Sequence, residues 1–435
     1  MAAASVVGSP VLEAALRKAR WRLIPLLAVG YLIAYMDRSN ISYAAESMNR
    51  QLHFSAHVYG LGAGLFFVSY ALCEVPSNAL LLRSGARRWL ARILLTWGVL
   101  AAGMMLVRSA QSFYGVRLLL GCAEAGYFPG AIYYLSRWFP AMQRARAISW
   151  FYISLPLSTV LMGLVAGSLL HLDGRLGLRG WQWLFLVEGL PAVLLSAGFW
   201  MWLPDSPETA EWLTEEEREA LIMELTLDSP GHGSRADLKQ VLLEPRVWVL
   251  GFFAFCMLGM SYAVNFFLPL MLSGMMHWST KRIGYGVAVA GVLAAAAMVL
   301  NAMHSDRTGE RRWHIAMPML IIGGMSLLAA SRVGGGWPAA LALLLILVPF
   351  CAMQGPMLVI ASRLCPGKNA ALAVAVFNMC GMCGGFVGPY WMGWMRELTG
   401  GYPVGIGSLC VPALAAAGCI LWLTGKSAVE AQERG

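Results

Sequence analysis

The chain has 435 residues, of which 58% are hydrophobic and only 13% are charged. Soluble domains carry about 25% charged residues, so this chain has too few charges to cover a soluble surface of its size. Its formal charge of +9 does not indicate a nucleic-acid partner, because the basic residues lie in short loops and form no patch with interleaved aromatic residues. The composition therefore predicts an integral membrane protein.

The hydrophobic residues gather in blocks of roughly twenty residues, the length that crosses a bilayer as an α-helix. We predict an all-α protein with twelve transmembrane helices, the first of which is retained rather than cleaved as a signal peptide. In chain order the predicted spans cover residues 21–44, 57–82, 89–108, 112–138, 145–170 and 181–203, and then 246–276, 282–303, 313–332, 337–362, 369–395 and 402–425. An even number of spans places both termini on one side of the membrane.

The basic residues of the short loops predict the orientation of these spans. With the N-terminus inside, the cytoplasmic loops hold more than twice as many lysines and arginines as the outer loops. Because positive charge accumulates on the cytoplasmic side of membrane proteins, we expect both termini in the cytoplasm.

Residues 204–245 separate the spans into two groups of six, which predicts an N-terminal half over residues 1–203 and a C-terminal half over residues 246–435. Thr214 and Glu217 have the spacing of a capping box, so we expect a short acidic helix from there to about Leu227. A solvated connector is the simplest interpretation, and regulation or partner docking is the alternative.

A repeated loop supports the division into two halves. Residues 83–89 (RSGARRW) and 307–313 (RTGERRW) are identical at five of seven positions and occupy the same place in each group of spans. Parallel six-helix repeats are a transporter architecture, with the substrate site at their interface near the membrane midplane.

These loops are the predicted cytoplasmic gate, although a generic basic loop is the alternative. In the second copy we expect Asp306 to pair with Arg307 or Arg311 when the gate is shut. The first copy contributes Arg83 and Arg87. It has a leucine where the second copy has Asp306, so we expect it to lack that acidic partner.

The basic loops resemble the signature of the major facilitator superfamily, and six further segments resemble its anion:cation symporter family. These segments are residues 35–41 (YMDRSNI), 74–78 (EVPSN), 117–124 (RLLLGCAE), 183–189 (WLFLVEG), 203–207 (LPDSP) and 384–389 (GGFVGP). The resemblance covers nearly all twelve spans and implies two six-helix halves in the inner membrane of a bacterium. It also implies an organic-anion substrate, among sugar acids, hydroxy-dicarboxylates such as tartrate, and aromatic acids.

Ionisable side chains inside membrane spans are costly and mark a pathway or a site by default. The clear cases all lie in the first six spans: Asp37, Arg38, Glu74, Arg117, Glu124 and Glu188. Arg117 and Glu124 are seven residues apart, so they share a helix face at about 10 Å separation along the axis. We interpret Glu74 as a partner of the loop arginines and Glu188 as structural.

Arginine binds carboxylates bidentately and keeps its charge, so we predict that Arg38 and Arg117 bind the anion. Asp37 and Glu124 are the predicted proton carriers, because a substrate that draws an arginine away promotes protonation of the neighbouring carboxylate. The family resemblance implies the same roles at these positions. An ion-pair network that only ties two helices together is the alternative.

Further polar side chains in the spans are candidate substrate contacts. Tyr35 lies one turn before Arg38, and Tyr70 matches a substrate-facing tyrosine of the family. Asn265 and Asn378 offer amides that read hydroxyl groups without adding charge. Aromatic packing and hydrogen bonds between helices are the alternatives.

The sequence contains no GxxxxGK[ST], HExxH or GxSxG motif, which argues against ATP-driven transport and against an enzyme. Neither the cysteines nor the histidines have metal-ligand spacing, so no metal or cofactor is expected. We predict a monomeric secondary transporter that imports a sugar acid or tartrate-like carboxylate with protons by alternating access. The alternatives are an aromatic-acid symporter, a transport-inactive sensor, or a drug/proton antiporter, although span 145–170 lacks the glycine-proline motif of such exporters.

Overall fold

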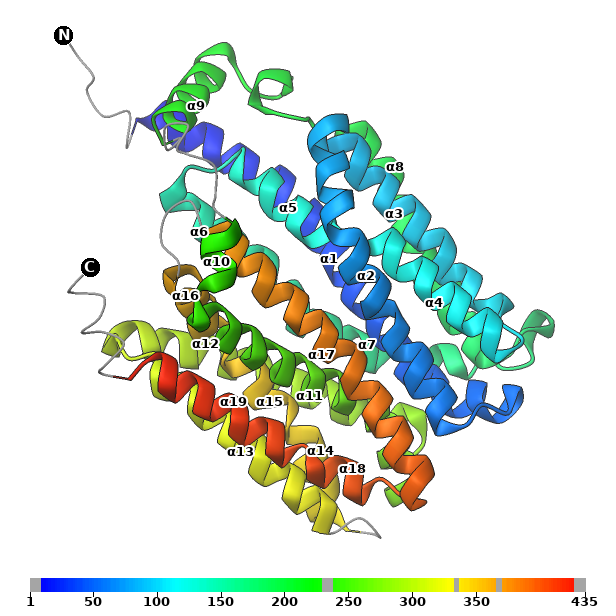
Figure 1. Cartoon of the computed structure of the whole chain (residues 1–435). Helices are drawn as coiled ribbons and strands as arrows, with labels where there is room; N and C mark the ends of the chain where they lie inside the picture. Colours follow the sequence, from blue (N-terminus) through cyan, green and yellow to red (C-terminus); the bar gives the residue numbers. More distant parts are fainter. Residues whose placement is uncertain (1–8, 229–237, 332–335, 365–369, 426–435) are drawn as a thin grey trace.

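The computed structural model describes residues 9–228, 238–331, 336–364 and 370–425. Over these ranges the chain forms helices, turns and short loops, with no β-strand. Figure 1 shows two helix bundles side by side, one from each half of the chain. The first helix begins and the last helix ends at the same end of the molecule, which we call the terminal face; the opposite end is the distal face.

The first bundle follows the first six predicted spans. Its helices are α1 (Pro10–Leu52), α2 (Ala56–Ser84), α3 (Ala86–Gly103), α4 (Ala110–Glu124), α5 (Tyr127–Ser136), α6 (Ala141–Tyr152), α7 (Ser154–Leu170) and α8 (Gly180–Trp202). The described part of the connector holds α9 (Glu215–Asp228) and α10 (Leu238–Leu243). The second bundle contains α11 (Pro245–Met276), α12 (Thr280–Thr308), α13 (Arg312–Ser331), α14 (Trp337–Leu345), α15 (Leu347–Ala352), α16 (Gln354–Leu364), α17 (Ala370–Thr399), α18 (Pro403–Ser408) and α19 (Cys410–Leu423).

Within the described residues, 10 stretches of helix are long and apolar enough to cross a membrane. The other two predicted spans are residues 21–44, which lie inside α1, and residues 112–138, which divide between α4 and α5. These two spans carry most of the buried charged side chains of the bundle, which makes both less apolar than their neighbours. The predicted span 337–362 is likewise divided, into α14, α15 and α16.

The connector is attached to the first bundle by α9. The predicted capping box is present: the Thr214 backbone N–H donates to Glu217 at 3.0 Å, and the Glu217 backbone N–H donates to the Thr214 hydroxyl at 3.3 Å. Lys18 of α1 also pairs with the Glu217 carboxylate at 2.7 Å. Burial acts to raise the pKa of Glu217, but the hydrogen bonds from Lys18 and Thr214 outweigh it and hold that pKa below its ordinary value.

The two bundles meet closely at the distal face through glycines. A Cβ atom added to Gly163 of α7 would lie 2.4 Å from the carbonyl oxygen of Gly284 in α12. One added to Gly60 of α2 would lie 2.4 Å from the carbonyl oxygen of Pro389 in α17. The helices therefore touch backbone to backbone, as small residues permit in membrane proteins.

Hydrogen bonds join the bundles at the same face. The Ser55 hydroxyl donates to Glu397 at 2.9 Å, and the Ser273 hydroxyl donates to Glu46 at 2.8 Å. Deeper in the bundle, the Tyr59 hydroxyl donates to the backbone carbonyl of Phe266 at 2.9 Å. The distal face is therefore shut in this structure.

Gly163→Ala should lower the melting temperature of the purified protein. In a helix interior alanine is normally more stable than glycine by about 0.5–1 kcal/mol, but here the methyl group meets the backbone of α12. Gly324→Ala in α13 is the matched control, because no atom lies within 4 Å of the added Cβ. Thermal unfolding followed by fluorescence checks both variants, and equal shifts in the two would contradict the close contact at the distal face.

Candidate substrate-binding site

Arg38 and Glu124 form an ion pair in the interior of the first bundle. Arg38 Nε and Nη2 lie 2.7 Å and 2.6 Å from Glu124 Oε1. Arg38 is 6% exposed and Glu124 is 1% exposed, so the pair is removed from solvent. The second oxygen of Glu124, Oε2, has no hydrogen-bond partner among the described residues. The structure thus brings together one predicted anion-binding residue and one predicted proton carrier.

A break in the fourth predicted span places the Glu124 carboxyl. The helix α4 ends at Glu124, and α5 begins after Gly126, whose φ of +91° is one that side chains disfavour. A carboxylate at the C-terminal end of a helix faces the negative end of the helix dipole. The negative charge of Glu124 therefore depends on Arg38.

Aromatic rings surround the Arg38 guanidinium. Its central carbon lies 5.1 Å from the ring centre of Tyr35, 5.0 Å from that of Tyr70 and 5.5 Å from that of Phe66. Such cation–π contacts stabilise a guanidinium group that is buried away from water. Tyr35 and Tyr70, both predicted as substrate contacts, therefore lie beside the predicted anion-binding arginine.

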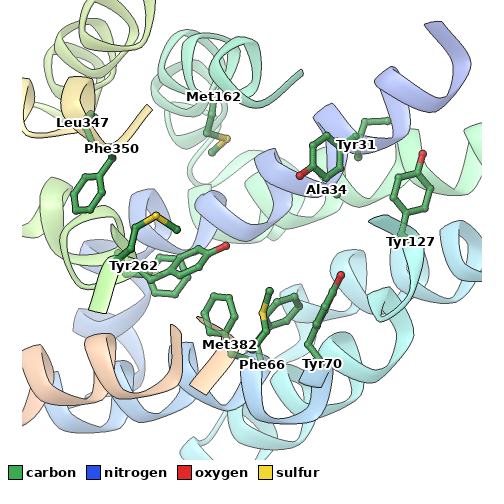
Figure 2. Close-up of a cluster of buried hydrophobic side chains, with 14 of the residues drawn as sticks. Tyr31, Ala34, Phe66, Tyr70, Tyr127, Met162, Tyr262, Leu347, Phe350 and Met382 are labelled. Atoms are coloured by element: carbon green, nitrogen blue, oxygen red, sulfur yellow. The ribbon is translucent and has the colours of Figure 1, made fainter. Parts of the chain in front are cut away.

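The second bundle reaches the same region through Tyr262 of α11. Figure 2 shows Tyr262 together with Phe66 and Tyr70 of α2 and Met382 of α17. Tyr262 is 8% exposed and close enough to Arg38 to interact with it electrostatically. Sequence reasoning overlooked Tyr262, although a tyrosine in an otherwise apolar span was a signal that it carries a hydroxyl to the interior.

Arg117 is held differently from Arg38. Its Nε and Nη2 donate to the backbone carbonyls of Gly62 and Ala63 in α2, at 3.3 Å and 3.0 Å. Its guanidinium also lies 4.8 Å from the ring centre of Phe66, and the residue is 1% exposed. Arg117 thus joins α4 to α2 through the backbone, and no ion pair with Glu124 forms in this structure.

Asp37 faces α3 and does not share the Arg38–Glu124 pair. Trp97 Nε1 donates to Asp37 Oδ2 at 2.7 Å, and Asn40 Nδ2 donates to Oδ1 at 2.8 Å. The carboxyl is 3% exposed and both of its oxygens are occupied. The predicted proton carriers therefore lie in two separate environments.

Glu74 and Asn378 bridge the two bundles. The Asn378 amide nitrogen lies 2.8 Å from each carboxylate oxygen of Glu74, which joins α17 to α2. The expectation that Glu74 pairs with loop arginines is wrong in this structure, because Glu74 turns inward to the other bundle. The amide nitrogen of Asn378, which was predicted as a substrate contact, therefore donates to Glu74 in this structure.

Asn265 lies at a small cavity between the bundles. Its amide nitrogen donates to the Ser261 carbonyl of its own helix at 2.7 Å. The cavity has a volume of about 30 Å³, and its polar lining includes Asn265, Ser39 and Ser42. Asn265 is thus placed where the two bundles face each other.

The second repeated loop holds the expected ion pair. Arg311 Nη1 lies 2.6 Å from Asp306 Oδ1 and 3.1 Å from the Ser305 hydroxyl. Of the two arginines proposed for Asp306, the structure selects Arg311 over Arg307. The glycine of each loop, Gly85 or Gly309, has positive φ and ends the preceding helix.

The first repeated loop has no counterpart of the Asp306–Arg311 pair among the described residues, but a carboxylate of the connector binds its backbone. Asp205, at the start of the connector, accepts a hydrogen bond from the Arg87 backbone N–H at 3.0 Å. The carboxylate thereby caps the N-terminus of α3, where negative charge is favourable. The Arg87 side chain donates to the Trp200 carbonyl at 2.7 Å, while Arg83 is exposed. An acid from the connector replaces the one that the loop itself does not carry.

A double-mutant cycle on Glu74 and Asn378 should give a coupling energy of about 1.5–3 kcal/mol, the range for hydrogen bonds to charged groups. Glu74→Ala, Asn378→Ala and the double variant are compared by chemical unfolding of the purified protein. Asn265→Ala is the control partner for Glu74→Ala, because Asn265 bonds within its own helix. Additive effects of the Glu74 and Asn378 variants would contradict the bridge between the bundles.

Comparison with known proteins agrees with this fold. The sequence profile of the Major Facilitator Superfamily matches residues 27–389. A "Putative tartrate transporter" of Agrobacterium vitis is 41% identical over 392 residues, which cover 90% of this chain and 87% of that protein. A "Quinolone resistance transporter" of Acinetobacter baumannii is 34% identical over 406 residues, which cover 92% of each chain.

The inward-open xylose transporter XylE of E. coli has a similar structure, with a TM-score of 0.74 over 95% of this chain and 99% of that chain. Sequence identity is 17%, so this likeness concerns the fold alone. The predicted major facilitator fold is confirmed, and so is the prediction that the protein is not an enzyme. The chain belongs to the Major Facilitator Superfamily of membrane transporters.

Proposed function

We propose that the protein is a proton-coupled symporter of small organic carboxylates, with tartrate or a sugar acid as substrate, of the anion:cation symporter type. The observation that carries this proposal is the Arg38–Glu124 pair, a buried cation whose counterion is a carboxylate. A substrate carboxylate has the same charge and geometry as the Glu124 side chain. It therefore competes with Glu124 for the same guanidinium.

The competition couples the anion to a proton. When the substrate takes Arg38, Glu124 keeps its place at the end of α4 without a cation, in a site from which water is excluded. A buried carboxylate without a partner is costly enough to take up a proton instead. The free oxygen Oε2 is available to receive it. Release of the substrate restores the ion pair and expels the proton.

Alternating access follows from the two bundles. Residues 1–203 and 246–435 move as two halves about the central site, joined by the connector 204–245. With both termini in the cytoplasm, the shut distal face is the outer face of the transporter. The repeated loops lie on the opposite side, which closes in the outward-facing state; the Asp306–Arg311 pair is already formed in this structure and holds the second loop together. The protein works as a monomer in the inner membrane of a bacterium.

The ring-lined surroundings of Arg38 support aromatic acids as a second substrate class. Tyr35, Phe66 and Tyr70 present ring faces to the guanidinium, and a flat aromatic carboxylate packs well against such faces. A drug/proton antiporter, the activity that the name of the Acinetobacter relative suggests, is less well supported. Arg38 repels a drug that carries only positive charge, and among the described residues the acid beside the rings, Glu124, is already paired with Arg38.

Uptake into proteoliposomes tests the proposal. We expect radiolabelled L-tartrate, or a sugar acid such as galactonate, to accumulate when the lumen is more alkaline than the medium, and an uncoupler to abolish accumulation. Benzoate as competitor decides between the two substrate classes. Failure of every carboxylate to accumulate, together with proton-driven drug uptake, would reject the symporter in favour of the antiporter.

A further inference from the structure

Glu188 is a buried acid that the proposed coupling does not yet use. It lies in α8, is 5% exposed, and neither of its carboxyl oxygens accepts a hydrogen bond of normal geometry from a described residue. The other buried acids of the first bundle all have partners: Glu124 has Arg38, and Asp37 has Trp97 and Asn40. A carboxylate with no cation and no well-formed hydrogen bond is too costly to keep its charge in such a place, so burial favours a proton on Glu188.

The groups that face Glu188 come mainly from α1. Asp37 and Tyr43 are close enough to interact with it electrostatically, and the Asn40 side chain faces both carboxyls. From α3, Trp97 donates to Asp37. Two neighbouring carboxyls do not both ionise without cost. Asp37, with two donors, carries the charge, and Glu188 carries the proton.

A polar route leads from this pair to the interface between the bundles. Tyr43 faces Glu188 and also lines the cavity of about 30 Å³, with Ser39 and Ser42 of α1 and Thr159 of α7. A water molecule needs about 10–15 Å³ of such space and several polar partners, and the cavity offers both. In this structure the Tyr43 hydroxyl makes no hydrogen bond to Glu188, so transfer requires the two side chains to approach each other. Once they do, a hydronium ion in the cavity gives a proton to the Tyr43 oxygen as the Tyr43 hydroxyl passes its own proton to ionised Glu188, and the hydronium ion becomes water. The reverse sequence releases it.

We propose that Glu188 is a second proton-binding site of the transporter, which exchanges its proton with the cavity between the two bundles through Tyr43. This inference rests on the proposed proton symport and extends it. With Glu124 and Glu188 each carrying one proton, a dicarboxylate dianion such as tartrate enters without net movement of charge.

Infrared difference spectroscopy of the purified protein tests the site without any substrate. The carbonyl stretching band of a protonated carboxyl group should be present at pH 7 in Glu124→Gln protein and absent from the Glu124→Gln, Glu188→Gln double variant. The band should shift when H₂O is replaced by D₂O. Glu219→Gln, at an exposed carboxyl of α9, is the matched control and should leave the band unchanged. A band that persists without Glu188, or one that does not shift in D₂O, would overturn the proposal.

If Glu188→Gln does not fold, the variant Tyr43→Phe tests the proposed proton route instead. This variant removes the hydroxyl and little volume, so the band should remain while its exchange in D₂O slows. Unchanged exchange would overturn the route through Tyr43.

The transport assay then tests the coupling. In proteoliposomes Glu188→Gln should lower the number of protons moved per tartrate by about half and make uptake sensitive to membrane potential. An unchanged ratio would show a fixed structural proton and reject Glu188 as a carrier. If wild-type protein does not transport tartrate at all, the proposed function fails on its own, and the infrared result still decides the protonation and exchange of Glu188.

Discussion

Arg38→Ala should weaken binding of the carboxylate substrate by about 30-fold or more. Arg38 is the buried cation that the substrate shares with Glu124, and removal of one partner of a buried, hydrogen-bonded charge pair costs about 2–5 kcal/mol. Isothermal titration of the purified variant with the substrate identified by uptake measures the effect. Arg38→Lys should recover only part of the affinity, because an ammonium group lacks the bidentate fork.

The control for this experiment is Arg50→Ala. Arg50 lies in the same helix and also pairs with a carboxylate, Glu46, but its side chain is 77% exposed. Its loss should leave affinity unchanged. Arg38→Ala also leaves the buried Glu124 carboxylate without its cation. The double variant Arg38→Ala, Glu124→Gln should therefore regain stability and still bind the substrate only weakly. Normal affinity in a folded Arg38→Ala protein would exclude Arg38 from the substrate site.

Glu124→Gln should lose much of its accumulation of substrate against a gradient while it retains exchange across the membrane. Glutamine keeps the shape of the side chain and a carbonyl oxygen for Arg38, but it cannot bind and release a proton. Uptake driven by a pH gradient should therefore fall to the level that the proton on Glu188 alone supports, whereas counterflow from preloaded vesicles should continue. Rates in the variant should also become less dependent on pH in the range where wild-type uptake rises as the outside is acidified.

An exposed acid serves as the control for Glu124→Gln. Glu216 lies in the first turn of α9, outside the bundle, and Glu216→Gln should accumulate substrate like the wild type. If Glu124→Gln concentrates substrate as strongly as the wild type in response to a pH gradient, Glu124 is not a coupling acid. The ion pair with Arg38 would then be a tie between α1 and α4, the alternative reading of these charges.

Hydropathy predicted the positions of the spans because a helix that crosses the bilayer needs an apolar stretch of fixed length. It carries no information on how far each helix continues beyond the membrane. Thus α1 runs over Pro10–Leu52, well past the predicted span 21–44 at both ends. Nor did it predict the break after Glu124, since an apolar stretch remains apolar whether its helix is straight or interrupted. Gly126 has positive φ at this break, and a Cβ added to it would lie 2.4 Å from the Ser77 hydroxyl oxygen, so the turn requires glycine.

The site was predicted as a set of residues, but its internal pairings were not. Charged side chains in apolar spans are conspicuous, and they predicted both Arg38 and Glu124 as members of the site. The partners of Asp37 and Glu74 depend on helix rotation and on the register between the bundles. Trp97 is far from Asp37 in sequence, and Asn378 is far from Glu74. The hydrogen bonds between them therefore depend on how the helices pack and could not be predicted from sequence.

The contact at the distal face has a consequence for the ionic strength of the medium. It joins the bundles through glycine backbones and through hydroxyl-to-carboxylate hydrogen bonds, and among the described residues no ion pair crosses it. Dissolved salt screens ion pairs but scarcely weakens dispersion contacts. Salt on that side should therefore leave the closed contact almost untouched, whereas salt on the terminal side reaches the exposed Asp306–Arg311 pair. The two faces of the protein should thus respond unequally to the same increase in ionic strength.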